Sequence, residues 1–208
     1  MKKTARKKLL QVNCSDSGST GGIMRGIAAR AQQHGYECRM LCAPPKPGEN
    51  RGDDVIRLGN PVECALQRKL NKFTGRYGMG FPLASRQLLQ ELERFAPDIV
   101  QLHNLHHQFF DLSTLFGYLK KHRIPTVWTL HDCWAFTGHC AHYMMNGCER
   151  WRTGCGDCPD LQHYPAIYRD TTAQLYAQKA ALYANMENLF LVAPSDWTKA
   201  QIAALSLI

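Results

Sequence analysis

The 208-residue sequence predicts an α/β fold built on a doubly wound, mostly parallel sheet. Short apolar runs alternate with longer amphipathic segments along the whole chain. Turn-forming or polar residues follow the apolar runs, and no internal repeat or low-complexity segment breaks the pattern. Parallel strands need long crossover connections, which are usually helical and right-handed. The alternation therefore predicts a Rossmann-like arrangement with helices on both faces of the sheet.

The first half of the chain supplies four predicted strands and three predicted helices. Apolar runs of strand length occupy residues 9–14, 36–43, 55–58 and 99–102. Apolar residues recur at helical spacing over residues 23–34, 62–73 and 85–95. Gly35 and Pro97 follow the first and third of these helices, as expected where helices end. Residues 15–22 predict a turn, residues 44–54 a loop, and residues 75–82 a glycine-rich bend.

The second half of the chain supplies two more strands, at 127–130 and 189–193, and three more helices, at 110–122, 171–186 and 197–205. Between them, residues 133–165 show no clear period and hold five of the nine cysteines. This stretch predicts an irregular, cysteine-rich insertion. We therefore expect residues 1–208 to form a single domain that carries the insertion at 133–165.

The composition is that of a soluble globular protein, with 45% hydrophobic and 20% charged residues. No run reaches the roughly 18–20 apolar residues of a membrane span. The apolar part of the basic N-terminus is too short for a signal peptide and reads well as a first strand. The sequence therefore predicts a cytoplasmic protein, whose thiols stay reduced.

The formal net charge is +8, and much of it lies in two clusters. A basic patch can face nucleic acid, anionic lipid or a phosphorylated ligand. It can equally be a solvated tail and a solvated helix face. The two clusters consist of Lys2, Lys3, Arg6, Lys7 and Lys8, and of Arg68, Lys69, Lys72 and Arg76.

Ligands of open parallel sheets bind at the carboxyl ends of the strands. This rule selects residues 15–22, 103–107, 131–132 and 194–196. The first of these segments contains the glycines Gly18, Gly21 and Gly22 between a strand and a helix. Glycine lets backbone approach a ligand closely, and free N–H groups at a helix start favour an anion such as phosphate. A plain tight turn is the alternative.

Polar side chains also follow the fourth and fifth predicted strands. The fourth strand is followed by His103, Asn104, His106 and His107, and the fifth by His131 and Asp132. Imidazole can hydrogen-bond a hydroxyl group or move a proton near neutral pH. Because the two strands are expected to be neighbours, these residues predict a shared polar site. Asp132 can instead cap the segment that follows it.

The insertion contains the spacing C-x7-C-x6-C-x2-C, formed by Cys140, Cys148, Cys155 and Cys158. Four cysteines permit a tetrahedral structural zinc site, and C-x2-C is a usual ligand spacing. His139 or His142 could replace one thiolate. Disulfides and reduced thiols packed as small apolar groups are the two alternatives.

The segment VWTLHDCWAFTGHCAHY, continued by GCERWRTGCGDCP, resembles the central signature of a branch of glycosyltransferase family 4. Within that branch, the chain is most similar to exopolysaccharide glycosyltransferases of the colanic-acid type. GSTGG, its helix and HGYEC resemble the family's first turn, and VAPSDWTKAQ resembles the segment before its interdomain hinge. The resemblance covers essentially the whole chain.

This resemblance implies the two-domain GT-B architecture, of which the chain matches only the N-terminal, acceptor-side half. We find no counterpart of the second half, which carries the nucleotide-sugar pocket and a pair of glutamates. We therefore expect the C-terminal domain to be absent and the chain alone to be inactive. One alternative is a truncated fragment with no activity of its own. The other is a zinc-knotted nucleic-acid-binding module, but only Phe73 and Tyr77 lie among the basic residues to stack on bases.

The resemblance also implies roles for the strand-end residues. Family members transfer a sugar from a nucleoside diphosphate with retention of configuration, and this chemistry requires no metal. Gly21 and Gly22 correspond to glycines that approach the donor diphosphate, and His131 to a histidine that contacts the transferred sugar. We assign Asp132 to the catalytic site with His131, Gly18 to the donor phosphate, and His103, Asn104, His106 and Ser195 to the acceptor cleft.

The expected substrates are a nucleoside-diphosphate-sugar and a growing exopolysaccharide or lipid-linked glycan. The basic segments fit an acceptor on a lipid carrier at an anionic inner membrane. No nucleic acid is expected as a partner.

Overall fold

The computed structural model describes residues 6–45 and 54–203. At its centre is a six-stranded sheet in the order β3-β2-β1-β4-β5-β6, and all neighbouring strands run parallel. The α/β, Rossmann-like fold predicted from the sequence is confirmed, and each strand lies within one residue of its predicted bounds. The strands are β1 (Lys8–Asn13), β2 (Glu37–Cys42), β3 (Val55–Arg57), β4 (Ile99–Leu102), β5 (Thr126–Thr129) and β6 (Leu189–Val192).

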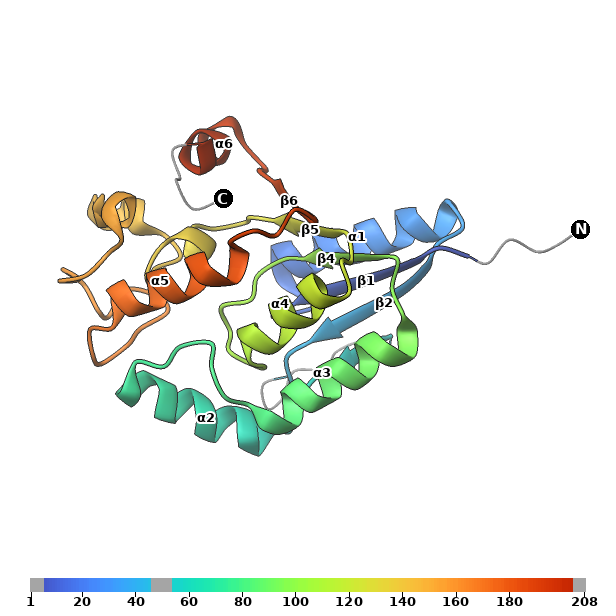
Figure 1. Ribbon diagram of the computed structural model, residues 1–208, viewed down its shortest axis with the longest axis horizontal. Helices are drawn as coiled ribbons and strands as arrows, with labels where there is room; N and C mark the ends of the chain where they lie inside the picture. The colour runs from blue at the N-terminus through green and yellow to red at the C-terminus, as the bar shows by residue number, and fades with distance from the viewer. Residues whose placement is uncertain (1–5, 46–53, 204–208) are drawn as a thin grey trace, which may run out of the picture.

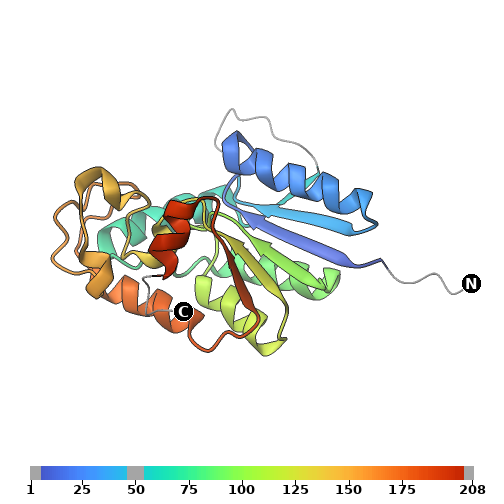
Figure 2. The ribbon, with the colours of Figure 1, turned by 90° about the horizontal axis from the view of Figure 1, so that it is seen from above.

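Helices cover both faces of this sheet (Figure 1, Figure 2). Helix α1 packs on one face, where Met24 and Ala28 join a small apolar cluster with β2 and β3. Helices α3, α4 and α5 cover the other face and enclose the larger core. The helices are α1 (Gly18–Gln33), α2 (Pro61–Thr74), α3 (Pro82–Phe95), α4 (Leu112–Lys121), α5 (Thr172–Tyr183) and α6 (Asp196–Ala203).

Local chemistry explains where several elements begin and end. β1 is buried along five of its six residues because helices lie over both faces of the central strands. Asn60 caps α2 through its side-chain oxygen, and Pro61 occupies the first turn, where no N–H group is needed. Gly75 ends the same helix in the left-handed conformation. Asp111 accepts the Thr114 N–H and so caps α4.

The start of α1 differs from the sequence prediction. Residues 15–22 were expected to form a turn, but the helix already begins at Gly18. Only residues 14–17 therefore connect β1 to α1, and GSTGG forms the first helical turn. Glycine normally disfavours a helix, which explains why the sequence pattern places the start too late.

The insertion at 133–165 contains three single-turn 3-10 helices, η1 (Trp134–Phe136), η2 (Tyr143–Asn146) and η3 (Arg150–Thr153). An aromatic cluster holds them together. The ring of buried Trp151 lies 5.3 Å from Phe136 and 5.1 Å from Tyr143, and Tyr143 stacks on Trp197 of α6. The insertion is thus a small packed unit beside the carboxyl edge of the sheet.

Some sequence predictions concern residues outside the described part. Lys2 and Lys3 of the basic N-terminus, residues 46–53 of the predicted loop, and residues 204–205 of the last predicted helix belong to this group. Among the helices of the described residues, none is long and apolar enough to cross a bilayer.

Candidate functional site

The carboxyl ends of β1, β4 and β5 lie side by side, because β4 pairs with β1 on one side and with β5 on the other. The three segments that follow these strands, 14–22, 103–107 and 130–132, therefore share one edge of the sheet. A backbone hydrogen bond of 2.8 Å from Cys14 N–H to the Asn104 carbonyl joins two of them. Gly21 and His131 thus lie at the same edge, as the sequence prediction requires.

Two of the predicted histidines contact each other directly. Nδ1 of His103 lies 3.0 Å from Nε2 of His131, and the two rings stack at 5.3 Å. Nε2 of His103 lies 3.1 Å from Oε1 of Gln11, whose amide nitrogen donates to the Met24 carbonyl. These contacts form one hydrogen-bonded chain from α1 through β1 and β4 to the end of β5.

The hydrogen-bonded chain fixes the tautomer of each histidine. The Gln11 amide donates to a carbonyl, so its oxygen faces His103 and must accept from Nε2–H of that ring. Nδ1 of His103 then carries no proton and accepts from Nε2–H of His131. Nδ1 of His131 is left as a hydrogen-bond acceptor. This arrangement suits a neutral imidazole that accepts a hydrogen bond from a hydroxyl group.

Burial keeps both rings neutral at physiological pH. Burial, and secondarily repulsion from His131 if both rings were protonated, lowers the pKa of His103 to about 4. Burial also lowers the pKa of His131, although the carboxylate of Asp132 acts in the opposite direction. Neither ring is therefore a proton donor of the imidazolium type at pH 7.

His106 and Asp132 form a second pair at the same edge. Oδ2 of Asp132 lies 3.0 Å from Nε2 of His106, and Oδ1 accepts the Trp134 N–H at 2.9 Å. Nδ1 of His106 lies 3.2 Å from the hydroxyl of Tyr164, whose pKa burial raises to about 12. Both carboxylate oxygens of Asp132 are thus engaged. The bond to the Trp134 N–H resembles the capping contact that the sequence left open as an alternative for Asp132.

The glycines of α1 differ in what they contact. A Cβ atom on Gly21 would lie 2.3 Å from the carbonyl carbon of Asp16, so only glycine fits there. Around Gly22 no other atom would lie within 4 Å of such a Cβ. Gly18 has a φ of +70°, which favours glycine. The close approach at Gly21 is therefore to the chain's own loop, and it brings the helix start against residues 14–17.

Asp16 organises this loop and was not identified from the sequence. Its buried carboxylate binds Arg57 through two hydrogen bonds of 3.0 and 2.8 Å, and Arg25 at 2.9 Å. Burial alone would raise the pKa of Asp16, but the two guanidinium groups hold it well below its usual range. Buried Gln11 was missed too, although a polar residue inside an apolar strand run is a readable signal.

Asn104 and Ser195 lie at the expected edge with mainly structural contacts. The Asn104 N–H donates to the Asn13 side chain at 3.3 Å, which links the ends of β1 and β4. The Ser195 hydroxyl accepts the Thr198 N–H at 3.1 Å and so caps α6. His107 lines a cavity of about 300 Å³ with Arg68, Lys72 and Tyr164.

The four insertion cysteines, for which the sequence left zinc, disulfides and reduced thiols open, are all free thiols in this structure. No disulfide joins them, and among residues 6–45 and 54–203 no group of three or more His, Cys, Asp and Glu side chains could hold a metal ion. Gly138 N–H donates to Cys155 Sγ, and His139 Nε2 lies 3.3 Å from Cys158 Sγ. Burial and the neighbouring cysteines raise the pKa of Cys140 to about 12. These contacts exclude disulfides in this structure and place the thiols of the insertion near one another.

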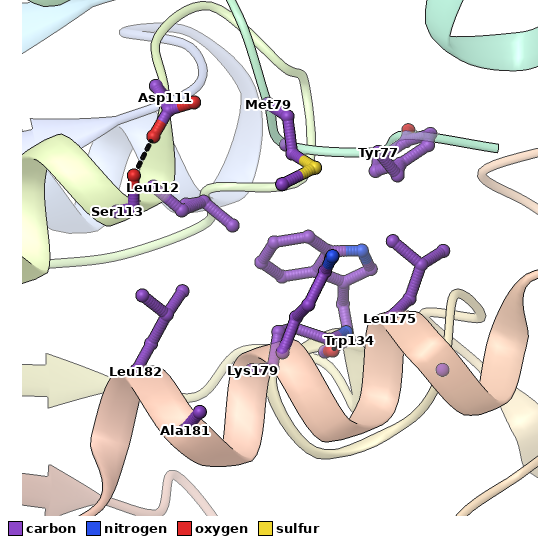
Figure 3. A pocket seen from close by; sticks show the side chains of 13 residues that line it. Tyr77, Met79, Asp111, Leu112, Ser113, Trp134, Leu175, Lys179, Ala181 and Leu182 are labelled. Carbon is purple, nitrogen blue, oxygen red and sulfur yellow. Dashed lines mark hydrogen bonds between the residues drawn. The ribbon is translucent and has the colours of Figure 1, made fainter. Parts of the chain in front are cut away.

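An apolar cavity of about 170 Å³ lies behind the site, between α5, η1 and the bend at 77–79. Figure 3 shows Lys179 beside the ring of Trp134 at its wall. Burial lowers the pKa of Lys179 to about 7, and its Nζ donates to the Trp134 carbonyl. The nucleic-acid alternative loses support here, because Tyr77 is buried at this cavity and its hydroxyl bonds to the His106 carbonyl.

Three comparisons bear on what this edge does. Residues 23–205 match the family described as Glycosyltransferase Family 4. The chain is 38% identical over 185 residues to WcaC of Escherichia coli (strain K12), whose name assigns it as a glycosyl transferase of colanic acid biosynthesis. That match covers 81% of this chain and 43% of the relative.

Among solved structures, sucrose-phosphate synthase from Thermosynechococcus elongatus has a similar fold, with a TM-score of 0.54 at 9% sequence identity. The match covers 95% of this chain and 45% of that chain. This likeness identifies the fold as one half of a GT-B structure. The chain thus spans less than half the length of each protein it matches.

Proposed function

The chain belongs to glycosyltransferase family 4, and from this premise we propose that it is the acceptor-side half of a retaining sugar transferase. The donor is a nucleoside-diphosphate-sugar, and the acceptor is a growing exopolysaccharide or lipid-linked glycan. In this reaction the bond between the anomeric carbon and the diphosphate breaks. The acceptor oxygen bonds to the same carbon, and its proton leaves with the diphosphate or the solvent.

The main support for this proposal is the position and protonation state of His131. Its ring is held by His103, is neutral, and leaves Nδ1 as an acceptor at the carboxyl edge of the sheet. A hydroxyl group of the transferred sugar can donate to that atom. Because the hydrogen-bonded chain through Gln11 fixes the ring beforehand, little reorganisation is needed when the sugar binds.

The start of α1 is the proposed place of the donor diphosphate. Gly18 and the following N–H groups lie in the first helical turn, where the helix dipole favours an anion. Gly21 permits the tight connection from β1, and exposed Gly22 leaves open space beside the turn. The Asp16 ion pairs with Arg25 and Arg57 hold this connection in place.

His106 and Asp132 are proposed as positioning residues. The pair bridges the segments after β4 and β5, and Asp132 also accepts the N–H of Trp134 at the start of η1. Their geometry supports holding the edge in one arrangement, so that His131 faces the cleft. Asn104 and Ser195 complete the acceptor-side edge through their contacts with Asn13 and Thr198.

We propose that transfer needs no cofactor and takes place in the cytoplasm, on the inner face of the membrane. A second Rossmann-like half is proposed to supply the base and ribose pocket. The experiment combines this chain with such a half, adds nucleotide-sugars and a glycan acceptor, and follows the product by NMR. Transfer with retained anomeric configuration is expected, with no turnover by the chain alone. Turnover by the isolated chain, or an inverted product, would contradict the proposal.

A further inference from the structure

Helix α2 carries a row of exposed apolar side chains along its outer face. Val62, Leu66, Leu70 and Phe73 are 74%, 69%, 51% and 59% exposed. Their spacing of four, four and three residues places them on one stripe of the helix. Leu83, at the start of α3, is 61% exposed and is one more exposed apolar side chain near the start of α2.

The inner face of α2, with buried Cys64 and Asn71, attaches the helix to the rest of the protein. On its inner face, Asn71 donates to the Met79 carbonyl and to the Gln108 side chain, at 3.0 and 2.8 Å. Glu63 accepts the N–H groups of Leu83 and Ala84 at the start of α3. The apolar stripe is therefore not required to fix the helix in the described structure. Contiguous exposed apolar surface of this kind usually marks an interaction site.

The charges around the stripe are basic. Lys69 is exposed beside the stripe, and exposed Arg76 follows the helix. Glu63 is the one acidic residue of α2, and both its carboxylate oxygens are bonded at α3. A helix with an apolar face bordered by lysine and arginine is typical of one that lies in the interface of an anionic bilayer.

We propose that α2 is a membrane-docking helix. Its apolar stripe enters the headgroup region of an anionic lipid bilayer, while Lys69 and Arg76 face the lipid phosphates. Figure 1 shows α2 at the outer edge of the molecule, at the opposite end from α6. Phe73 extends the docking face toward Tyr168, whose ring centre lies 5.1 Å away and whose side chain is 52% exposed.

Docking through α2 would bring one cavity close to the lipid headgroups. Arg68 and Lys72 line the 300 Å³ cavity together with His107 and Tyr164, on the inner side of the same helix. An acceptor whose phosphate is anchored in the bilayer could thus reach the carboxyl edge of the sheet. This consequence rests on the proposed function, whereas docking itself involves no sugar and no second half.

The test measures binding of the full chain to two kinds of vesicle by co-sedimentation. One kind is phosphatidylcholine alone, and the other contains about one-third phosphatidylglycerol. We expect at least about tenfold stronger binding to the anionic vesicles, weakened as salt screens the charges. The double variant Leu66→Gln and Leu70→Gln should lose at least about tenfold of that binding. Lys69→Gln with Arg76→Gln should remove the preference for anionic lipid.

The matched control replaces two exposed apolar residues elsewhere, Ile23→Gln and Met145→Gln. It should bind vesicles like the unchanged protein, and circular dichroism should show all variants folded. Equal binding by the α2 variants and the unchanged protein would overturn the proposal. So would a dimer that the Leu66 and Leu70 changes dissociate while vesicle binding is absent. Transfer to a soluble acceptor without vesicle binding would overturn docking and leave the proposed function standing.

Discussion

At the scale of single residues, the site depends on one histidine that another histidine holds in place. Nε2 of His131 has its partner in Nδ1 of His103, and Gln11 fixes that ring in turn. The outcome is an acceptor nitrogen aimed from a strand end, in a ring that stays neutral. In the proposed function, Nδ1 of His131 accepts a hydrogen bond from the sugar, and His103 and Gln11 hold the ring in place.

Folding stability should fall in mild acid because of this pair. The pKa of His103 drops on folding from 6.5 to about 4, so the unfolded chain binds more protons between those values. The free energy of unfolding therefore decreases as pH falls from about 6.5 to 4. Urea unfolding at pH 7 and pH 5 measures the loss. His103→Gln should be less stable at pH 7 but lose less on acidification, whereas exposed His122→Gln should keep the full slope.

Alanine substitutions at the neighbouring Gly21 and Gly22 should change folding stability in opposite directions. Gly21→Ala should destabilise the fold by about 1–3 kcal/mol, because its Cβ would meet the Asp16 backbone at 2.3 Å. Gly22→Ala should stabilise by up to about 1 kcal/mol, since it adds a better helix former in open space. Chemical denaturation measures both. A harmless Gly21→Ala would show that the tight β1–α1 connection is not needed.

At the scale of elements, the insertion is held by aromatic packing. Trp151 is 1% exposed and contacts the rings of Phe136 and Tyr143. Trp151→Ala should therefore cost about 3–5 kcal/mol of stability. Met145→Ala is the control in the same insertion, because its side chain is 76% exposed and should cost under about 0.5 kcal/mol. Equal losses in the two variants would contradict this view of the insertion.

Metal removal tests the cysteines separately. Burial raises the pKa of Cys140, Cys155 and Cys158, so a metal ion would have to displace protons from these thiols to bind them. A strong chelator should then leave the melting temperature unchanged, and purified protein should contain well under one zinc per chain. About one zinc per chain, lost together with stability on chelation, would restore the zinc expectation.

The sequence predicts the strands well and the connections less well. Strands such as β1 and β4 are mostly apolar because both faces of the central sheet are covered, so their bounds can be read directly. The start of α1 was placed too late because Gly21 is chosen for closeness to Asp16 rather than for helix propensity. The insertion has no period, since its aromatic contacts join residues far apart in the sequence.

The sequence predicts where the site residues lie but not how they contact one another. The strand-end rule correctly brings His103 and His131 to one edge, because it needs only the strand positions. Their direct contact spans 28 residues and depends on the register of β4 and β5, which a sequence pattern does not contain. The pairing of Asp132 with His106 is hidden for the same reason.

At the scale of the whole molecule, the proposed donor site and the proposed membrane contact lie on different elements. The carboxyl edge gathers the start of α1 and the His103–His131 pair, and the insertion supports that edge from beside β5. Helix α2 lies at the outer end with its basic, apolar face. In the proposed enzyme, one side of the molecule meets the membrane while the strand edge meets the donor and a second half.

The most direct test is the rate of sugar transfer when this domain, completed by a nucleotide-sugar-binding half, carries His131→Ala. Losing one preorganised contact to the reacting sugar should slow transfer by about 10²–10³-fold. His122→Ala is the control, since His122 is exposed at the end of α4 and should keep the full rate. A His131→Ala enzyme with unchanged rate would contradict the assignment of His131 to the transferred sugar.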